Sequence, residues 1–270
     1  MISMTSVPRR FLQALVSAVV LAPAVVSAQP ANSGFETTPI TNYGTGFGAP
    51  LLRSGPLGSV NPVAGSHFGL LIGSSCSSPL VGCPDNFTSS IPTSTFEGGL
   101  FAGVGSVTGS YRYSDIFTFA TGGTLSLRSN FLTNSCLCIE GNGDAAYVYL
   151  VGGASPIRLF GAFLAGDNNI FQLPPDGSVT QVAVAQGTAG IGGTDPFTWQ
   201  SGWYKSSVAV DAATNYQLMF LVSNGGGKEY EAGLAVDDIS YTSTVPEPST
   251  YALLAVGLLS IGAAARRRRA

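Results

Sequence analysis

The chain has 270 residues, of which 45% are hydrophobic and 10% are charged, and its formal net charge is −3. Residues 29–244 are more acidic, with 6 basic and 14 acidic side chains, which argues against nucleic acid as a partner because nucleic-acid binders need basic patches. This stretch is long enough for one sizeable core and is predicted to form a single domain.

The first 28 residues have the layout of a secretory signal peptide. Arg9 and Arg10 precede an apolar run, and small residues end the segment at Ala28. We therefore predict that signal peptidase cleaves after Ala28 and that the rest of the chain is exported through the inner membrane. The alternative is a buried N-terminal helix, and Pro23 inside the apolar run argues against it.

Residues 42–66 are rich in Gly and Pro and are predicted to form long loops, followed by the only histidine of the chain, His67. A Ser-His-Asp triad would have to use His67, but the sequence has no Gly-x-Ser-x-Gly elbow. We therefore interpret His67 as an ordinary loop or strand-end residue, and we predict no catalytic residue.

Four cysteines in an exported chain predict two disulfides, for which three connectivities exist. Cys76 and Cys83 flank a short loop, whereas Cys136 and Cys138 are separated by one residue, so a bridge between them would be strained. We favour the pairs 76–83 and 136–138, and crossed pairs between the two loops are the alternative.

Short apolar or alternating runs recur through the rest of the domain, separated by turns rich in Gly, Asn and Pro. The expected strands are 110–120, 124–127, 145–151, 157–164, 179–185, 203–210, 216–222 and 233–241. Regular short strands with such turns predict an all-β sandwich.

Aromatic residues lie in or beside these expected strands: Tyr111, Tyr113, Tyr147, Tyr149, Trp199, Trp203 and Tyr204. Sugar-binding sandwiches use exposed aromatic faces, yet Tyr and Trp also form sandwich cores when their polar end finds a partner. Tyr147 and Tyr149 share one face of their expected strand, and Val148 and Leu150 share the other. Core or half-buried packing is the favoured interpretation of these aromatic residues.

The chain ends in three successive features: Pro246-Glu247-Pro248, a run of 15 uncharged and mostly apolar residues (251–265), and Arg266, Arg267, Arg268 and Arg269. The run is short for a bilayer core of ~30 Å, which takes about 20 helical residues, and the arginines favour the cytoplasmic side. This order resembles the PEP-CTERM sorting signal of Gram-negative bacteria. The resemblance implies a short transmembrane helix as a transient inner-membrane anchor, removal of the tail by an exosortase, and release to the cell surface or extracellular matrix.

Other motifs are similar to secreted jelly-roll modules and to PEP-CTERM surface proteins. They are NSGFE at 32–36, NFLTN at 130–134, GDAAYVYL at 143–150, SGW at 201–203 and LAVDDIS at 234–240. The resemblance implies a galactose-binding-like, jelly-roll-like antiparallel β-sandwich, as in many carbohydrate-binding modules.

The jelly-roll resemblance also implies a structural calcium ion. Glu36 is placed in the opening strand and Asp237 and Asp238 in the closing strand, and such modules often share a calcium between these two strands, with an acid from each. Calcium takes six to eight oxygen ligands. The apolar alternation changes phase between Val236 and Ile239, which predicts a β-bulge that turns a carboxylate aside. Exposed strand-end acids are the alternative.

The sequence therefore predicts three segments: a signal peptide (1–28), one β-sandwich domain (29–244) and a sorting signal (245–270). The predicted function is non-enzymatic binding or structure in the extracellular polysaccharide matrix of a biofilm. A secreted polysaccharide-active hydrolase is the alternative, because carboxylates that could serve glycoside hydrolysis are present but nothing in the sequence pairs them.

Overall fold

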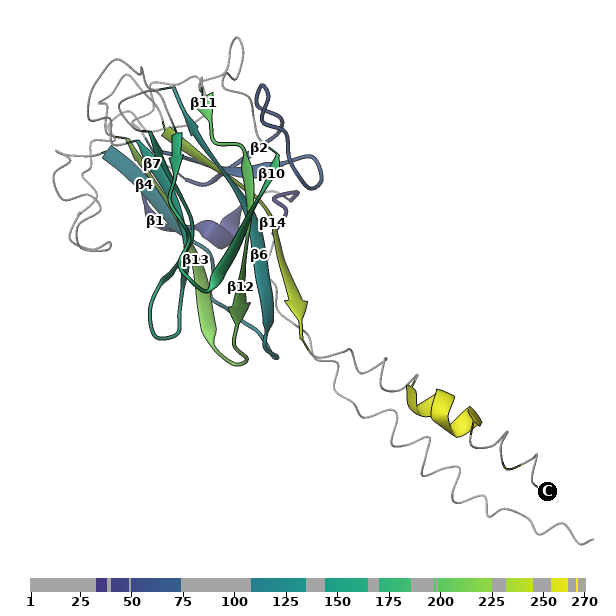
Figure 1. The fold of residues 1–270 in the computed structure, drawn as a ribbon. Coiled ribbons are helices and arrows are strands. Elements are labelled where there is room, and N and C mark those ends of the chain that lie inside the picture. Colours follow the sequence, from purple (N-terminus) through teal and green to yellow (C-terminus); the bar gives the residue numbers. More distant parts are fainter. Residues whose placement is uncertain are drawn as a thin grey trace, which may run out of the picture.

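The computed structural model describes residues 33–37, 40–48, 50–73, 108–134, 144–164, 170–185, 197, 199–224, 232–244, 254–261 and 266. Within these residues the chain forms two seven-stranded sheets, and every pairing between neighbouring strands is antiparallel. Figure 1 shows the two sheets packed face to face. The predicted all-β sandwich is confirmed.

Sheet A contains, in spatial order, β1 (Thr45–Phe47), β4 (Thr108–Tyr113), β13 (Asn215–Asn224), β7 (Ala145–Val151), β8 (Ile157–Leu164) and β9 (Ile170–Gln172), with β5 (Phe117–Thr118) beside β13. Sheet B contains β10 (Val179–Ala185), β12 (Trp203–Val210), β6 (Gly123–Thr133), β14 (Ala232–Ser243), β3 (Phe68–Ile72) and β2 (Leu52–Ser54), with β11 (Trp199–Gln200) beside β6. A single 3₁₀ turn, η1 (Thr41–Tyr43), precedes β1.

Most expected strands match observed ones. The strands expected at 145–151, 157–164, 179–185 and 203–210 coincide with β7, β8, β10 and β12. The strand expected at 110–120 is two strands, β4 and β5, and the short run expected at 124–127 is the eleven-residue β6. The sequence missed β3, which directly follows the Gly- and Pro-rich stretch, and β1, β2, β9 and β11, which have two or three residues each and no visible periodicity.

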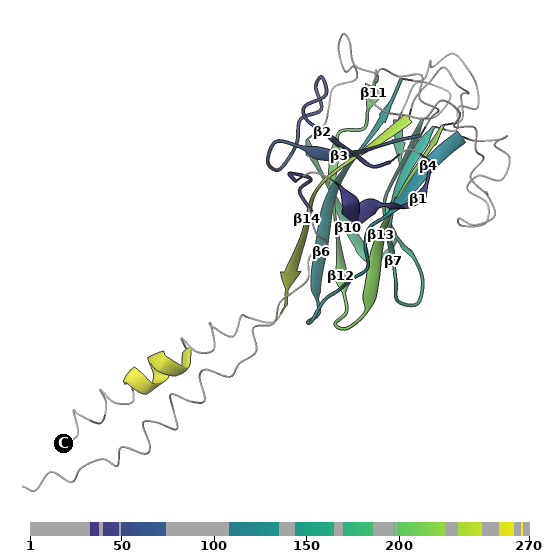
Figure 2. The ribbon, with the colours of Figure 1, turned by 180° about the vertical axis from the view of Figure 1, so that it is seen from behind.

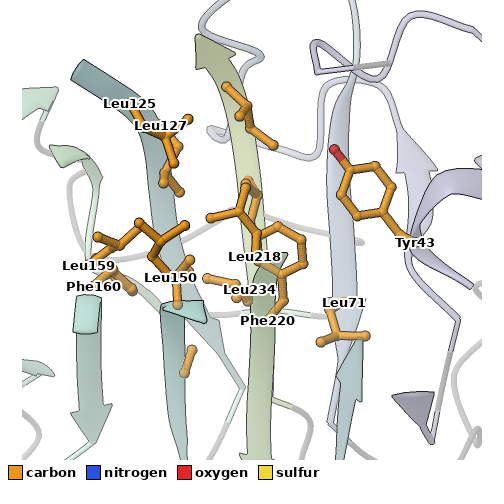
Figure 3. Packing of buried hydrophobic residues seen from close by; sticks show 14 of the residues in the cluster. Tyr43, Leu71, Leu125, Leu127, Leu150, Leu159, Phe160, Leu218, Phe220 and Leu234 are labelled. Carbon is orange, nitrogen blue, oxygen red and sulfur yellow. The ribbon is translucent and has the colours of Figure 1, made fainter. Parts of the chain in front are cut away.

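The main core lies between the sheets and follows the two-residue period of the strands. On β7, Ala146, Val148 and Leu150 point into this core, where Leu218 and Phe220 of β13 meet them. Figure 3 shows Leu125 and Leu127 of β6 and Leu234 of β14 in the same layer with Leu150 and Phe220. The side chains labelled there are at most 2% exposed. Tyr147 and Tyr149 on the other face of β7 are buried as well, so the alternation alone did not tell which face of this strand lies between the sheets.

A second apolar cluster covers the outer face of sheet B. Leu57 and Val60, which bond to each other through their backbones, pack in this cluster with Phe68 and Trp203. The Trp203 indole N–H donates to the Asn61 carbonyl oxygen at 3.0 Å. The predicted loop between β2 and β3 therefore acts as a cover over the sheet.

The closing strand β14 contains the predicted β-bulge. Asp237 pairs with Arg128 and Ser240 with Ser126, so the register against β6 shifts between Asp237 and Ser240. Asp238 has a φ of +50°, a conformation that Asp tolerates better than most residues. Because of this extra residue, Val236 and Ile239 both reach the main core.

The two ends of the sandwich differ. At one end the strands are joined by four or five residues, at 119–122, 152–156 and 211–214. β14 also ends there, with Ser243 opposite Gly123, and Figures 1 and 2 both show the chain leaving the sandwich at this end. We call this the short-turn end. At the opposite end lie Ile72, Thr133 and Ala232, where β3 and β6 end and β14 begins.

The end of β14 predicts the C-terminal limit of the folded domain. A chain covering residues 29–244 should melt at the same temperature as one covering 29–250, whereas a chain ending at Asp238 should lose its cooperative transition. The shorter chain loses Ile239 and Tyr241 from the core, each worth about 2–5 kcal/mol, against a total stability of about 5–15 kcal/mol. Thermal circular dichroism checks this, and a clearly lower melting temperature for 29–244 than for 29–250 would show that the domain extends further.

Candidate functional site

The C-terminal segment stands apart from the sandwich. Residues 254–261 form a helix whose large apolar side chains, Leu254, Val256, Leu258, Leu259 and Ile261, are 57–68% exposed. Figure 2 shows this helix beyond the end of β14, away from both sheets. The helix at 254–261 therefore does not pack into the core of the sandwich.

The sequence predicts a short transmembrane helix in this segment. Among the residues that the structure describes, no helix is long and apolar enough to cross a membrane.

The last strand holds the chain just before the predicted sorting motif. The Thr244 N–H and hydroxyl both donate to the Gly122 carbonyl oxygen, at 3.1 and 2.8 Å. The Tyr241 hydroxyl donates to the Thr121 carbonyl oxygen at 2.6 Å. Pro246-Glu247-Pro248 and Arg267–Arg269 lie outside the described residues, so the fixed point nearest to the motif is Thr244.

A second candidate site surrounds the Glu36 carboxylate. Its Oε1 accepts the backbone N–H groups of Ser66 and His67 at 2.7 and 2.9 Å, and its Oε2 accepts the Ser66 hydroxyl at 2.8 Å. Gly65, with a φ of +68°, lies directly against this carboxylate, where a Cβ would collide with Oε1. The hydrogen bonds, those from the Ser66 backbone first, lower the pKa of Glu36 to about 2.

Arg53 closes the same site from the other side. Its guanidinium donates to the carbonyl oxygens of Phe35 and Glu36 at 3.0 and 3.1 Å, and its Nη2 lies 2.9 Å from Nδ1 of His67. The same Nδ1 lies 2.7 Å from the Ser66 Oγ and 3.1 Å from Oε2 of Glu36, so it stands between a guanidinium, which only donates, and a carboxylate, which only accepts. His67 is thus part of a hydrogen-bonded loop contact.

Asp237 makes the corresponding contact from the closing strand. Its side chain is fully buried, and Oδ2 accepts the backbone N–H groups of Val63 and Ala64 at 2.6 and 2.9 Å. Its Oδ1 accepts the Asp238 N–H at 2.7 Å. Burial raises the pKa of Asp237, and the three N–H donors oppose that rise.

Asp238 points to a different partner. Its Oδ2 lies 3.3 Å from Nε of Arg128, and the geometry makes this an ion pair without a hydrogen bond. The Asp238 side chain is 31% exposed, so the pair contributes about 0–1 kcal/mol. The bulge therefore sends its two carboxylates to separate places.

The structure brings Glu36 and Asp237 to the same loop, residues 63–67. The expected pairing of an opening strand with the closing strand is not what brings them there. Glu36 does not lie in an opening strand, because residues 33–37 form turns and Phe35 has a φ of +56°. Both carboxylates face N–H donors, whose positive ends do not fit a cation, and the described residues contain no group of three or more His, Cys, Asp and Glu side chains that could hold a metal. The calcium ion stays a prediction.

The expected aromatic packing is confirmed. Tyr147 and Tyr149 are 3% and 4% exposed on the outer face of sheet A and stack on each other with ring centroids 6.1 Å apart. Tyr111 and Tyr113 extend the same cluster, and Trp203 is buried on sheet B against Phe68. These rings fill apolar clusters of the fold.

The other predicted sites lie outside the described residues. They are the cleavage point at Ala28 and the four cysteines, Cys76, Cys83, Cys136 and Cys138. Sequence reasoning missed Arg53 and Ser66 as partners of Glu36. Arg53 could have been noticed, because it is one of only 6 basic residues in 29–244, but a serine in a Gly-rich loop gives no such signal.

Comparison with known proteins identifies the C-terminal segment. Residues 244–269 match the PEP-CTERM protein-sorting motif, which indicates export and sorting to the cell surface. No curated protein matches the chain. Among solved structures, the K3 cleaved adhesin domain of Lys-gingipain from Porphyromonas gingivalis W83 is similar, with 13% identity and a TM-score of 0.29 over 66% of this chain and 74% of that one. The strands and their antiparallel pairings themselves show the fold.

Asp237 and Asp238 offer a matched pair of substitutions. Asp237→Asn places an amide NH₂ against buried N–H donors, and an unmade buried hydrogen bond costs about 1–3 kcal/mol. Asp238→Asn keeps a residue that tolerates positive φ and should change stability by less than about 1 kcal/mol. Urea unfolding measures the stability of both variants, and equal losses of unfolding free energy would contradict the role given to Asp237.

Melting curves of the same proteins with calcium and with chelator decide the calcium prediction, because a bound ion stabilises the folded state.

The lowered pKa of Glu36 predicts a pH dependence. Its folded pKa of about 2 lies below the ordinary value of 4.5, so its ionised form stabilises the fold above about pH 4.5, and this contribution is lost as the pH falls toward 2. Glu36→Gln should melt below the wild type at pH 7, and the gap should narrow between pH 4.5 and 2. A gap that stays constant over this range would contradict the assignment.

Proposed function

Because the chain carries a PEP-CTERM protein-sorting motif at residues 244–269, we propose that it is an exosortase substrate that is held at the inner membrane by its tail and then released. The observation that carries this proposal is the position of the motif. It begins at Thr244, the residue at which the β-sandwich ends. Removal of everything after Thr244 leaves every described strand intact.

The exposed helix at 254–261 supports the proposal. A row of apolar side chains in water costs free energy, at about 25 cal/mol for each Å² left exposed, and such a patch marks a contact surface. The sandwich does not cover these side chains. A lipid or enzyme environment that covers them before processing would remove that cost, and release of the tail would remove the patch itself.

The mature domain is proposed to bind or to give structure within the extracellular polysaccharide matrix. A binding or structural role is supported by the hydrogen bonds of four of the seven acidic side chains that the structure describes. Glu36 and Asp237 hold backbone N–H groups, Asp144 accepts the buried Thr133 hydroxyl at 2.7 Å, and Asp176 accepts the Arg158 N–H at 2.6 Å. Carboxylates engaged in this way are structural, and the hydrolase alternative needs two that face each other across a cleft.

Intact-mass measurement of the released protein tests the sorting step. The surface-released chain should begin at Gln29 and lack Arg266–Arg269, and Glu247→Ala should leave the full tail attached in the membrane fraction. Asp211→Asn is the matched control, because it changes one acidic residue in an exposed turn and should be processed normally. Released protein that still carries the four arginines would show that the tail is a permanent anchor. A glycan array with the released domain then tests polysaccharide binding.

A further inference from the structure

We infer that the sandwich has a fixed polarity relative to the membrane, with its short-turn end facing the lipid surface and the opposite end facing away. This inference rests on the proposed function, because it concerns the uncleaved chain held by its tail. Beyond the proposed function, it states which end of the domain an extracellular partner can reach before the tail is removed.

The first step is the point of exit. β14 lies between β6 and β3 in sheet B, and its last residue, Ser243, pairs with Gly123. Thr244 is bonded to Gly122 by its N–H and its hydroxyl. The chain therefore leaves the domain at the short-turn end, from a strand that is paired up to its last residue.

The second step is the length of chain that remains. β14 spans about 36 Å from Ser243 to Ala232, at roughly 3.3 Å per residue. The apolar run begins at Tyr251, and the residues from Thr244 to Tyr251 reach at most about 25 Å even when fully extended. The linker is therefore too short to run back along the sandwich and bring the opposite end to the membrane.

The third step is the surface that faces the lipid. The three turns at 119–122, 152–156 and 211–214 carry one charged residue, Asp211, which is exposed. Anionic headgroups attract basic residues and not a carboxylate. Among the described residues, the basic side chain at this end is Arg158 at the start of β8, which is 14% exposed and lies 3.7 Å from Asp176. No exposed basic side chain of the described residues would therefore bind this end flat to the membrane, and the connection through Thr244 sets the direction of the domain.

Two exposed positions on sheet A can report the polarity. Ser155 lies in the turn between β7 and β8, at the short-turn end, and Phe171 of β9 pairs with Phe163 near the far end of β8. Phe171 is 45% exposed. The two positions lie about 20 Å apart along β8 and on the same sheet, so a sideways tilt affects them similarly.

The experiment uses the chain from Gln29 to Ala270, with its C-terminal tail uncleaved, in vesicles of phosphatidylethanolamine and phosphatidylglycerol that contain an acceptor-labelled lipid. A donor fluorophore is introduced through a non-natural amino acid at position 155 or 171, so the native cysteines stay untouched. Energy transfer from position 155 should exceed that from position 171 severalfold. Inserting about twenty Gly and Ser residues after Thr244, with a reach of roughly 25 Å, should remove most of the difference.

Each outcome decides a separate point. Equal transfer from the two positions, or stronger transfer from position 171, in a chain that floats with the vesicles overturns the polarity and leaves the proposed sorting function in place. A chain that does not float with the vesicles overturns membrane holding by the tail, and the polarity with it. A difference that survives the long insertion shows that a direct contact of the domain with lipid orients it, which also overturns the tether argument.

Discussion

The buried carboxylate of Asp237 is the contact on which the arrangement of sheet B depends. A buried carboxylate is costly unless donors satisfy it, and three backbone N–H groups do so here, two from the loop after β2 and one from Asp238. The β-bulge makes this possible, because it turns Asp237 toward the loop while Val236 and Ile239 stay in the core. The loop that is fixed in this way covers Phe68 and Trp203 on the outer face of the sheet.

Glu36 extends the same arrangement to the beginning of the domain. It binds the loop two residues beyond the Asp237 contact, and Arg53 binds the carbonyl oxygens of Phe35 and Glu36. Phe35, which adopts a left-handed backbone conformation, has its ring fully buried in the main core and in contact with Gly69. The first described residues of the chain and the last strand, β14, thus meet at one loop, whose backbone N–H groups donate hydrogen bonds to the carboxylates of Glu36 and Asp237.

Whether a feature of the fold or of the candidate site could be predicted depends on how far apart in the sequence its interacting residues lie. Most strands of seven or more residues could be predicted, because a two-residue apolar period is visible in the local sequence. The change of phase between Val236 and Ile239 correctly located the bulge. The hydrogen-bond partners of Glu36 and Asp237 could not be predicted from the sequence. Asp237 and Val63 are 174 residues apart, and every residue type except proline carries a backbone N–H, so the sequence does not mark which one donates. Glu36 and Asp237 were expected to share a calcium ion, which stays a prediction, and the structure shows that backbone N–H groups donate to both carboxylates. The tail was the most readable part, because its features follow one another directly along the chain.

The order of strands in sheet B has a consequence for secretion. β14 is the last strand of the chain, yet it lies in the interior of the sheet, where it joins β6 to β3. A chain that crosses the membrane from its N-terminus presents β2 with β3, and β6 with β12, as separate halves with open edges until residues 232–243 emerge. Completion of the fold is thereby delayed to the end of translocation, when only the sorting segment remains to follow. Until β14 joins the two halves, β6 and β3 each have an unpaired edge, and unpaired strand edges make an incompletely folded chain prone to aggregation.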